Sequence, residues 1–216
     1  SDGEEIKHGG GEPSAEFLFG RERGIIDGKQ WQDDSFDYRL SSVKTYDDFE
    51  VLLKKCLSGI LKEHVKLACR SSLKFSQYCS SPIVSCFTND CIARGVDAGA
   101  GGAKYNFDYF CFPGFLTLSD SVAAVKKVVF DEQLLTLKEM SDLVKQNFAG
   151  NERMRQYLLN RCPKFGNDDD EADLIAQDLY NFIYQELQKY RMDLPNSTLY
   201  PSYFAWKMHG IFGERT

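Results

Sequence analysis

The sequence predicts an α/β fold in which long helices alternate with isolated, mostly parallel strands. Several segments place apolar residues with the 3.6-residue period of a helix, and short β-branched or aromatic runs separate them. Strands separated by long helices usually pair in parallel, so this order favours α/β over an all-α or an all-β fold. The sequence contains no internal repeat and no low-complexity segment.

The first long helix is expected to begin at Thr45. Thr45 and Asp48 form a pair typical of a helix N-terminus, where acidic side chains also suit the helix dipole. The run Ser80-Ser81-Pro82 should end this segment, because the residue before a proline disfavours helical backbone. The apolar residues that follow the helical period are Phe49, Leu52, Leu53, Cys56, Leu57, Ile60, Leu61, Val65 and Ala68.

Further helices are expected along the rest of the chain. Thr136 and Glu139 form a full capping box, and Gly150 should end the helix that they start. The apolar face of the last long helix is expected to contain Leu174, Ile175, Leu179, Phe182, Ile183 and Leu187. The expected segments are one or two turns over Asp90 to Arg94, a helix capped by Ser119-Asp120-Ser121, one over Thr136 to Phe148, one from Asn151 to Pro163, and one capped by Asp168, Asp169 and Asp170.

Two short runs, Ile83 to Phe87 and Leu199 to Trp206, predict strands because they are rich in β-branched and aromatic residues. The aromatic run from Tyr105 to Phe112 is expected to be buried. Residues 1–44 are rich in loop-forming residues.

Composition excludes several classes of function. The 216 residues carry a net charge of −6 without a basic stripe, which argues against binding to nucleic acid or to an anionic membrane surface. No apolar run reaches the ~20 residues that a membrane helix needs. The seven scattered cysteines form no C-x-x-C pair, which indicates free thiols in a reducing cytoplasm rather than a disulfide framework.

Two motifs have a structural interpretation that we prefer to a ligand-binding one. The glycine-rich loop from Gly95 to Gly102 fails the phosphate-binding pattern G-x-x-x-x-G-K-[ST], because Ala103 follows Gly102. A tight turn that lets two backbone segments approach closely explains it better. The acidic run from Asp168 to Glu171 lacks the spacing of a calcium loop and suits the start of a helix.

No metal site or cysteine nucleophile is predicted. Cys86 and Cys91 have the wrong spacing for zinc. Cys86 and Cys111 lie in runs that look buried, and burial would raise the pKa of each thiol and make it unreactive. His64 is expected on the surface of the first long helix. The histidines retained as site candidates are His8 and His209.

Several motifs, in the same order along the chain, resemble those of the glycyl radical enzymes, and more narrowly the pyruvate formate-lyase-like dehydratase and lyase branch. Residues 82–97 resemble P-F-L-S-x-x-x-D-D-C-I-E-R-G-K-D, and Gly101 to Asn106 resembles G-G-A-x-Y-N. Residues 120–130 resemble D-S-L-A-A-I-K-K-L-V-F, and residues 163–170 resemble P-K-Y-G-N-D-D-D. The other similar segments are residues 28–30, 199–201 and 209–213.

This resemblance implies that residues 1–216 form an internal segment of a ten-stranded α/β barrel. The expected activity is radical cleavage of a C–O, C–N or C–C bond in a small organic substrate under anaerobic conditions, by a dehydratase, a lyase or a formate acetyltransferase-like enzyme. A radical S-adenosylmethionine, iron–sulfur activase places the radical on a glycine, which then generates a thiyl radical on a cysteine. A cytoplasmic homodimer is expected, with neither nucleic acid nor membrane as a partner.

Two departures from the family pattern limit this expectation. The thiyl cysteine of G-C-x-E should precede Ser1 and the radical glycine should follow Thr216, so no residue here is assigned a catalytic role and the segment alone should be inactive. A non-catalytic or truncated relative with a structural role is the alternative. Asp108 to Pro113 replaces the small run T-G-P-Q-G-V, which indicates either a subgroup with an aromatic substrate or another partner element, or drift in a packed segment.

The resemblance also suggests site residues. His8 and Gly9 match a W-H-D stretch that contacts substrate in several dehydratases, with glycine in the aspartate position. The strand residues Tyr203, Ala205 and Lys207, which share one face, are further pocket candidates. A structural role is expected for Gly101 and Gly102 in a tight turn, for Asn106 in fixing that turn through hydrogen bonds to the main chain, and for Tyr105 with its ring in the core.

Overall fold

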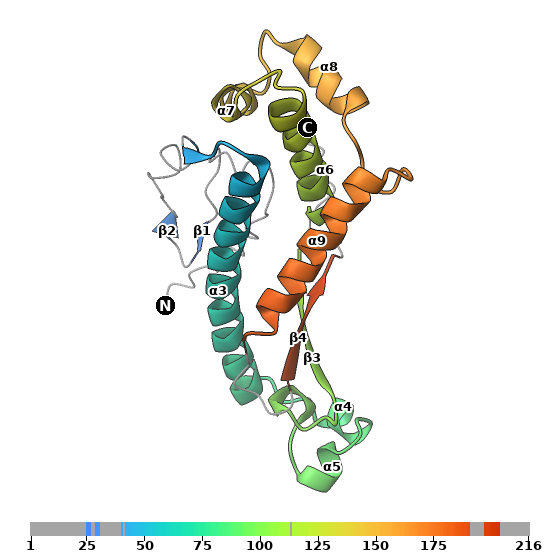
Figure 1. Cartoon of the computed structure of the whole chain (residues 1–216). Helices are drawn as coiled ribbons and strands as arrows, with labels where there is room; N and C mark the ends of the chain where they lie inside the picture. Colours follow the sequence, from blue (N-terminus) through green and yellow to red (C-terminus); the bar gives the residue numbers. More distant parts are fainter. Residues whose placement is uncertain are drawn as a thin grey trace. The chain divides into compact units, whose positions relative to one another are not determined.

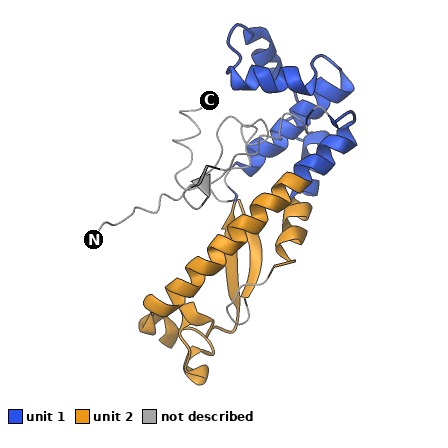
Figure 2. Ribbon diagram, turned by 90° about the vertical axis from the view of Figure 1, so that its left-hand side faces the viewer, with its two compact units in different colours: residues 1–54, 112–179, 205–216 blue, residues 55–111, 180–204 orange. Residues whose placement is uncertain are grey.

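The computed structural model describes residue 40, residues 42–112, 114–190 and 197–203, and the backbone of residues 25–26 and 29–30. The chain divides into two compact units, which Figure 2 shows in different colours. Unit 1 contains residues 1–54, 112–179 and 205–216, and unit 2 contains residues 55–111 and 180–204.

Unit 1 consists mainly of helices. The short strands β1 (Ile25–Ile26) and β2 (Lys29–Gln30) pair antiparallel. Its helices are the first part of α3 (Tyr46–Tyr78), α6 (Phe115–Val125) with the π-helical continuation η2 (Lys126–Asp131), α7 (Leu137–Lys145), α8 (Glu152–Arg161) and the first part of α9 (Asp170–Leu187).

The core of unit 1 centres on the apolar side of α6 and η2, where Leu118, Val122 and Val128 are fully buried or nearly so. Around it, Lys126 Nζ lies 2.9 Å from Asp131 Oδ2 and 2.5 Å from Glu171 Oε1, so one ammonium group links η2 to the start of α9. Partly exposed ion pairs of this kind add little stability, so burial of the apolar side chains is the main force that holds the unit.

Unit 2 is built around a parallel pair of strands, β3 (Asn106–Cys111) and β4 (Ser197–Ser202). The pair is in register from Asn106 opposite Ser197 to Cys111 opposite Ser202, and Figure 1 shows the two strands side by side. The remaining elements are the second parts of α3 and α9, α4 (Pro82–Cys86), α5 (Cys91–Arg94) and the 3₁₀ turn η1 (Ala98–Ala100). The predicted parallel pairing is therefore confirmed for these strands.

Most helix predictions are confirmed. Helix α3 begins at Tyr46, directly after the predicted Thr45, and runs to Tyr78. Thr136 and Glu139 form the capping box of α7 in both directions. The short helix α5, the helix α8 after Asn151 and the acidic start of α9 also agree with the sequence.

The predicted strand at Ile83 to Phe87 is wrong, because this segment is helix α4. The β-branched pair Ile83 and Val84 suggested a strand, but Pro82 at the first helical turn suits a helix start. Ser85 Oγ lies 2.9 Å from the carbonyl oxygen of Ser81, one helical turn earlier. A local turn with a proline start therefore prevails over β propensity.

Two other boundaries also differ from the prediction. Ser119 does not cap a helix, because α6 begins four residues earlier at Phe115, after Gly114 with a φ of +90°. Ser119 lies buried inside α6 and donates its hydroxyl to the Phe115 carbonyl oxygen at 3.0 Å, which removes the cost of burying it. Strand β4 begins at Ser197, before the predicted start, and Trp206 lies outside the described residues.

One expected face of α9 also needs correction. Leu179, Ile183 and Leu187 are buried as predicted, whereas the Leu174 side chain is exposed. The buried positions of the first turns are instead the small residues Ala172 and Ala176. Among the helices that the structure describes, none has a stretch apolar and long enough to cross a bilayer.

Candidate functional site

The residues that resemble the family's P-F-L-S to R-G-K-D motif form one compact network, which we call the Asp97 module (residues 81–104). The Asp97 carboxylate accepts hydrogen bonds from the Ser85 hydroxyl at 2.8 Å, from the Ser81 backbone N–H at 2.9 Å and from the Gly99 backbone N–H at 2.9 Å. These donors, with the Ser85 hydroxyl contributing most, hold the pKa of the Asp97 carboxyl below its usual range. The ionised carboxylate thus joins the start of α4 to the turn η1.

Ser85 is the second centre of this module. Its hydroxyl oxygen also accepts the backbone N–H of Ala98 at 2.9 Å, so the two residues fix each other and the turn between them. In the sequence motif these are the serine of P-F-L-S and the aspartate of R-G-K-D, twelve residues apart. Their contact gives a physical reason for the occurrence of both residues in one motif.

The two glycines of the module have different roles. Gly101 has a φ of +86°, a backbone conformation that residues with a Cβ rarely adopt. At Gly102 the limit is space, because a Cβ there would lie 2.0 Å from the Val96 carbonyl oxygen. The Gly102 N–H donates to the Asp97 carbonyl oxygen at 3.0 Å, so the two backbone segments touch. The predicted close turn at Gly101 and Gly102 is confirmed.

The prediction that Tyr105 packs in the core is wrong, and so is the expected burial of the whole run from Tyr105 to Phe112. The Tyr105 side chain is 67% exposed, and Phe107 and Tyr109 are also exposed. The run forms strand β3, whose alternating residues point to opposite faces. The odd-numbered residues lie on the open face, and only the last residue, Phe112, is buried.

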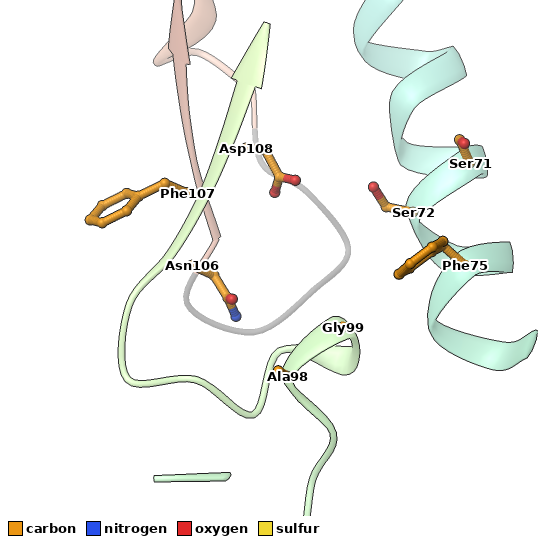
Figure 3. A pocket seen from close by; sticks show the side chains of 8 residues that line it. All are labelled: Ser71, Ser72, Phe75, Ala98, Gly99, Asn106, Phe107 and Asp108. Carbon is orange, nitrogen blue, oxygen red and sulfur yellow. The ribbon is translucent and has the colours of Figure 1, made fainter. Parts of the chain in front are cut away.

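The even-numbered face of β3 faces a pocket inside unit 2. This pocket has a volume of about 310 Å³, and Figure 3 shows Asn106 and Asp108 pointing toward α3 while Phe107 points the opposite way. The Asp108 carboxylate accepts a hydrogen bond from the hydroxyl of Ser197, which lies on the partner strand opposite Asn106. The lining residues are Ser71, Ser72, Phe75, Ala98, Gly99, Asn106, Phe107 and Asp108. The role of Asn106 in fixing the turn stays a prediction.

The odd-numbered face carries a cluster that the sequence analysis missed, which we call the aromatic face (Tyr105, Phe107, Tyr109 and Tyr200). The Tyr105 and Phe107 rings stack at 6.3 Å, and Phe107 meets Tyr200 edge to face at 5.6 Å. Tyr109 completes the cluster, at 6.4 Å from Tyr200 between ring centroids. The spacing of Tyr105, Phe107 and Tyr109 by two residues was the signal in the sequence that predicts a strand with one aromatic face.

Most of the substrate-pocket candidates lie outside the described residues. These are His8, Gly9, Ala205, Lys207 and the retained histidine His209. Tyr203 is described, and its ring lies 5.4 Å from that of Tyr180 on α9, where burial raises the pKa of its hydroxyl. Its proposed place in a substrate pocket stays a prediction.

The titratable residues of the described segments form no metal centre. No group of three or more histidine, cysteine or acidic side chains is placed to hold a metal ion in the part of the chain that the structure describes. The expected burial of Cys86 and Cys111 is wrong, since both thiols are exposed. His64 is half-buried rather than on the surface, and burial lowers the pKa of its imidazole. The capping role of the acidic run is supported by Asp169, which accepts the Glu171 N–H at 3.1 Å.

Comparison with known proteins gives the family. A model of pyruvate formate lyase-like proteins matches residues 20–213. The chain belongs to this family. Trans-4-hydroxy-L-proline dehydratase from Clostridioides difficile is 35% identical over 141 residues, which cover 62% of this chain and 17% of that protein. Isethionate sulfite-lyase from Bilophila wadsworthia is 40% identical over 111 residues, which cover 50% of this chain and 13% of that protein.

Solved structures agree with this assignment. The hydroxyproline dehydratase of C. difficile, with its substrate bound, superposes with a TM-score of 0.80 at 27% identity, over 93% of this chain and 25% of the other. The glycerol-bound B12-independent glycerol dehydratase from Clostridium butyricum gives a TM-score of 0.76 at 27% identity, over the same shares. This family member is therefore a helix-rich part of the glycyl radical α/β barrel, and it spans about a quarter of the length of these structures.

Proposed function

We propose that this chain is a segment of a glycyl radical dehydratase or lyase that cleaves a C–O, C–N or C–C bond of a small organic substrate under anaerobic conditions, or of a related formate acetyltransferase-like enzyme. The observation that carries the proposal is the family match over residues 20–213 together with an intact Asp97 module. The relatives named above are dehydratases and a lyase that act on small molecules.

The radical chemistry itself would come from other parts of the polypeptide. A glycyl radical, installed by an S-adenosylmethionine and iron–sulfur activase, would supply the one-electron oxidation that a closed-shell side chain cannot perform. None of the seven cysteines of this chain lies in a G-C-x-E motif. The contribution of the described residues would be architectural, because they hold two parallel strands and the turn before β3 in place.

The proposal includes two partners and a location. The activase would bind the folded enzyme before catalysis, and two copies of the full-length polypeptide would form a homodimer. The enzyme would work in the cytoplasm, where seven free thiols stay reduced. These statements rest on the family and not on contacts in this chain.

A non-catalytic relative with a structural role is the second candidate. The observation that favours it is the bulky run from Asp108 to Pro113 in place of a small T-G-P-Q-G-V run. Side chains of this size could fill the interior of a barrel and leave no room for a substrate.

One experiment separates the two candidates. The full-length polypeptide that contains this segment is co-produced anaerobically with its activase, and the glycyl radical is measured by electron paramagnetic resonance. We expect a radical signal that requires the activase and S-adenosylmethionine, with the same preparation lacking the activase as control. A folded protein that never acquires the radical would favour the structural role.

A further inference from the structure

The pocket of unit 2 gathers polar and aromatic side chains from two facing elements. Ser71 and Ser72 lie one turn of α3 before Phe75 and so share its side of the helix. Asn106 and Asp108 occupy alternate positions of β3, and Figure 3 shows both pointing toward α3. All five residues belong to unit 2, so the pocket is formed within one compact unit.

The Phe75 ring is the apolar side of the pocket, and it is 56% exposed. Its edge lies close to η1, since a Cβ built at Gly99 would lie 3.4 Å from Phe75 Cε1. The same Cβ would lie 3.2 Å from Asp97 Oδ1, so the Asp97 carboxylate lies close to this end of the pocket. An aromatic face near a negative charge favours a cation, because the ring quadrupole and the carboxylate both attract positive charge.

Asp108 supplies the negative charge of the pocket itself. The Ser197 hydroxyl donates to its Oδ2 and holds the carboxylate in position. A carboxylate has about four lone-pair sites, so this single bond leaves capacity for a ligand. Of the described residues that line the pocket, none is basic, so no lysine or arginine there neutralises Asp108. The hydroxyl groups of Ser71 and Ser72 can accept further hydrogen bonds. The pocket therefore suits a ligand that is positively charged and carries several donors.

We propose that this pocket is a binding site for a small soluble compound that carries a guanidinium group. A guanidinium ion is planar and rich in N–H donors, so it can stack on the Phe75 ring while it donates to the Asp108 carboxylate and the serine hydroxyls. An ammonium ion has fewer donors and no flat surface, and a neutral amide gains little from the carboxylates. A volume of about 310 Å³ admits this group with a short chain. The inference goes beyond the proposed function, because it concerns binding and includes no radical step.

Binding of methylguanidinium to the full-length polypeptide before activation tests this inference. Ligand-observed saturation-transfer NMR measures its affinity beside two matched probes. Methylurea has the same flat shape without the charge, and methylammonium has the charge without the flat group. We expect methylguanidinium to bind at least about 10-fold more tightly than methylurea, and also more tightly than methylammonium.

Variants place the probe in the pocket. Asp108→Asn should weaken methylguanidinium binding at least about 10-fold, because it removes the charge while its amide oxygen can still accept the Ser197 hydroxyl. Phe75→Leu, which keeps an apolar side chain without a flat face, should reduce the preference for methylguanidinium over methylammonium. Asp47→Asn is the matched control, because Asp47 is an exposed acidic residue in the first turn of α3, outside the pocket.

The outcomes are distinguishable. No saturable binding of methylguanidinium, equal affinity for methylguanidinium and methylurea, or unchanged binding in a folded Asp108→Asn variant would each overturn the inference. If Asp108→Asn does not fold, the comparison of the three probes on the wild type and on Phe75→Leu still decides the question. The glycyl radical signal is measured separately, so a negative result here rejects only the guanidinium site and leaves the enzymatic function standing.

Discussion

The Asp97 module and the aromatic face adjoin each other in sequence and follow opposite rules. In the module, residues that match the family pattern are held by specific contacts. Asp97 accepts three hydrogen bonds, and Gly102 leaves no space for a Cβ beside the Val96 carbonyl oxygen. In the aromatic face, Tyr109 departs from the pattern, and its ring is exposed. A position in a turn with close backbone contacts tolerates few residue types, whereas a position on an exposed sheet face tolerates many.

This difference indicates where the chain can vary its function. Backbone contacts in the module fix the point at which β3 begins, since the Lys104 N–H donates to the Asn89 carbonyl oxygen just before the strand. Once the start is fixed, alternation along the strand decides which residues reach each face. The face can then change its chemistry without changing the fold, as sites on rigid elements commonly do.

The largest expected effect follows from adding a single methyl group at Gly102. We expect Gly102→Ala to lower the free energy of unfolding of the full-length protein by at least about 2 kcal/mol, because the new Cβ would lie 2.0 Å from the Val96 carbonyl oxygen and backbone must move. Thermal and urea unfolding measure it, and the radical yield should fall with stability. Gly102→Val should cost still more.

Gly59 provides the control for the same substitution. It lies within α3, and nothing lies within 4 Å of the position that a Cβ would take. Gly59→Ala should leave stability unchanged or raise it by up to about 1 kcal/mol, because alanine favours a helix. A Gly102→Ala variant as stable as Gly59→Ala would show that the loop is flexible, and the contrast drawn above would be wrong.

The next effect depends on pH. Because hydrogen bonds from Ser85, Ser81 and Gly99 lower the pKa of Asp97, the folded state favours its ionised form. The stability it contributes is present above the pKa of an unfolded aspartate, about 3.9, and is lost as pH falls through the lower folded-state pKa. Asp97→Asn should therefore lower Tm at pH 7, and its Tm should converge with that of wild type in acid.

Asp47 is a suitable comparison for that measurement, because it is an exposed acidic residue in the first turn of α3. Asp47→Asn should change Tm far less at pH 7. Similar losses for both variants would show that general charge, and not the donors around Asp97, controls the acid transition.

A helix cap in unit 1 provides a scale for these effects. The Thr136 hydroxyl accepts the Glu139 N–H at 3.2 Å, and the Glu139 carboxylate accepts the Thr136 N–H at 2.7 Å. Thr136→Ala should cost about 1 kcal/mol of unfolding free energy, as N-cap substitutions commonly do. Urea unfolding measures this, with Thr136→Ser as the control that keeps the hydroxyl. A cost above that of Gly102→Ala would reverse the expected order.

The sequence predicts those parts of the structure that depend on local signals. Helices with caps, such as α7 after Thr136, and the close turn at Gly102 follow from nearby residues and are found as predicted. The prediction of a strand at Ile83 is wrong, because Ser81 and Pro82 favour a helix start more strongly than two β-branched residues favour a strand. The hydrogen bond from the Ser81 N–H to Asp97, sixteen residues away, supports this helix start, and a local sequence pattern does not include it.

Site features were harder to predict than elements. The aromatic face joins Tyr200 to two residues of β3 and to Tyr105 just before it, all more than ninety positions earlier, and only the strand register brings them together. Burial of Tyr105 was inferred from its aromatic character, but the face that a strand residue occupies depends on where the helices pack. The sequence pattern alone therefore predicts the residue types of the aromatic face and not the side to which they point.

The smallest expected effect on stability is that of Tyr105→Ala. Tyr105 belongs to the same G-G-A-x-Y-N motif as Gly102, yet its ring is 67% exposed and makes one stacked contact, with Phe107, and one with the Lys104 ammonium group at 5.4 Å. Removing the ring should cost less than about 1 kcal/mol, since exposed contacts contribute little. Urea unfolding of the full-length protein measures it beside Gly102→Ala. A loss as large as that of Gly102→Ala would mean that side chains from the rest of the barrel pack tightly against this face. That single result would remove the contrast between the two regions.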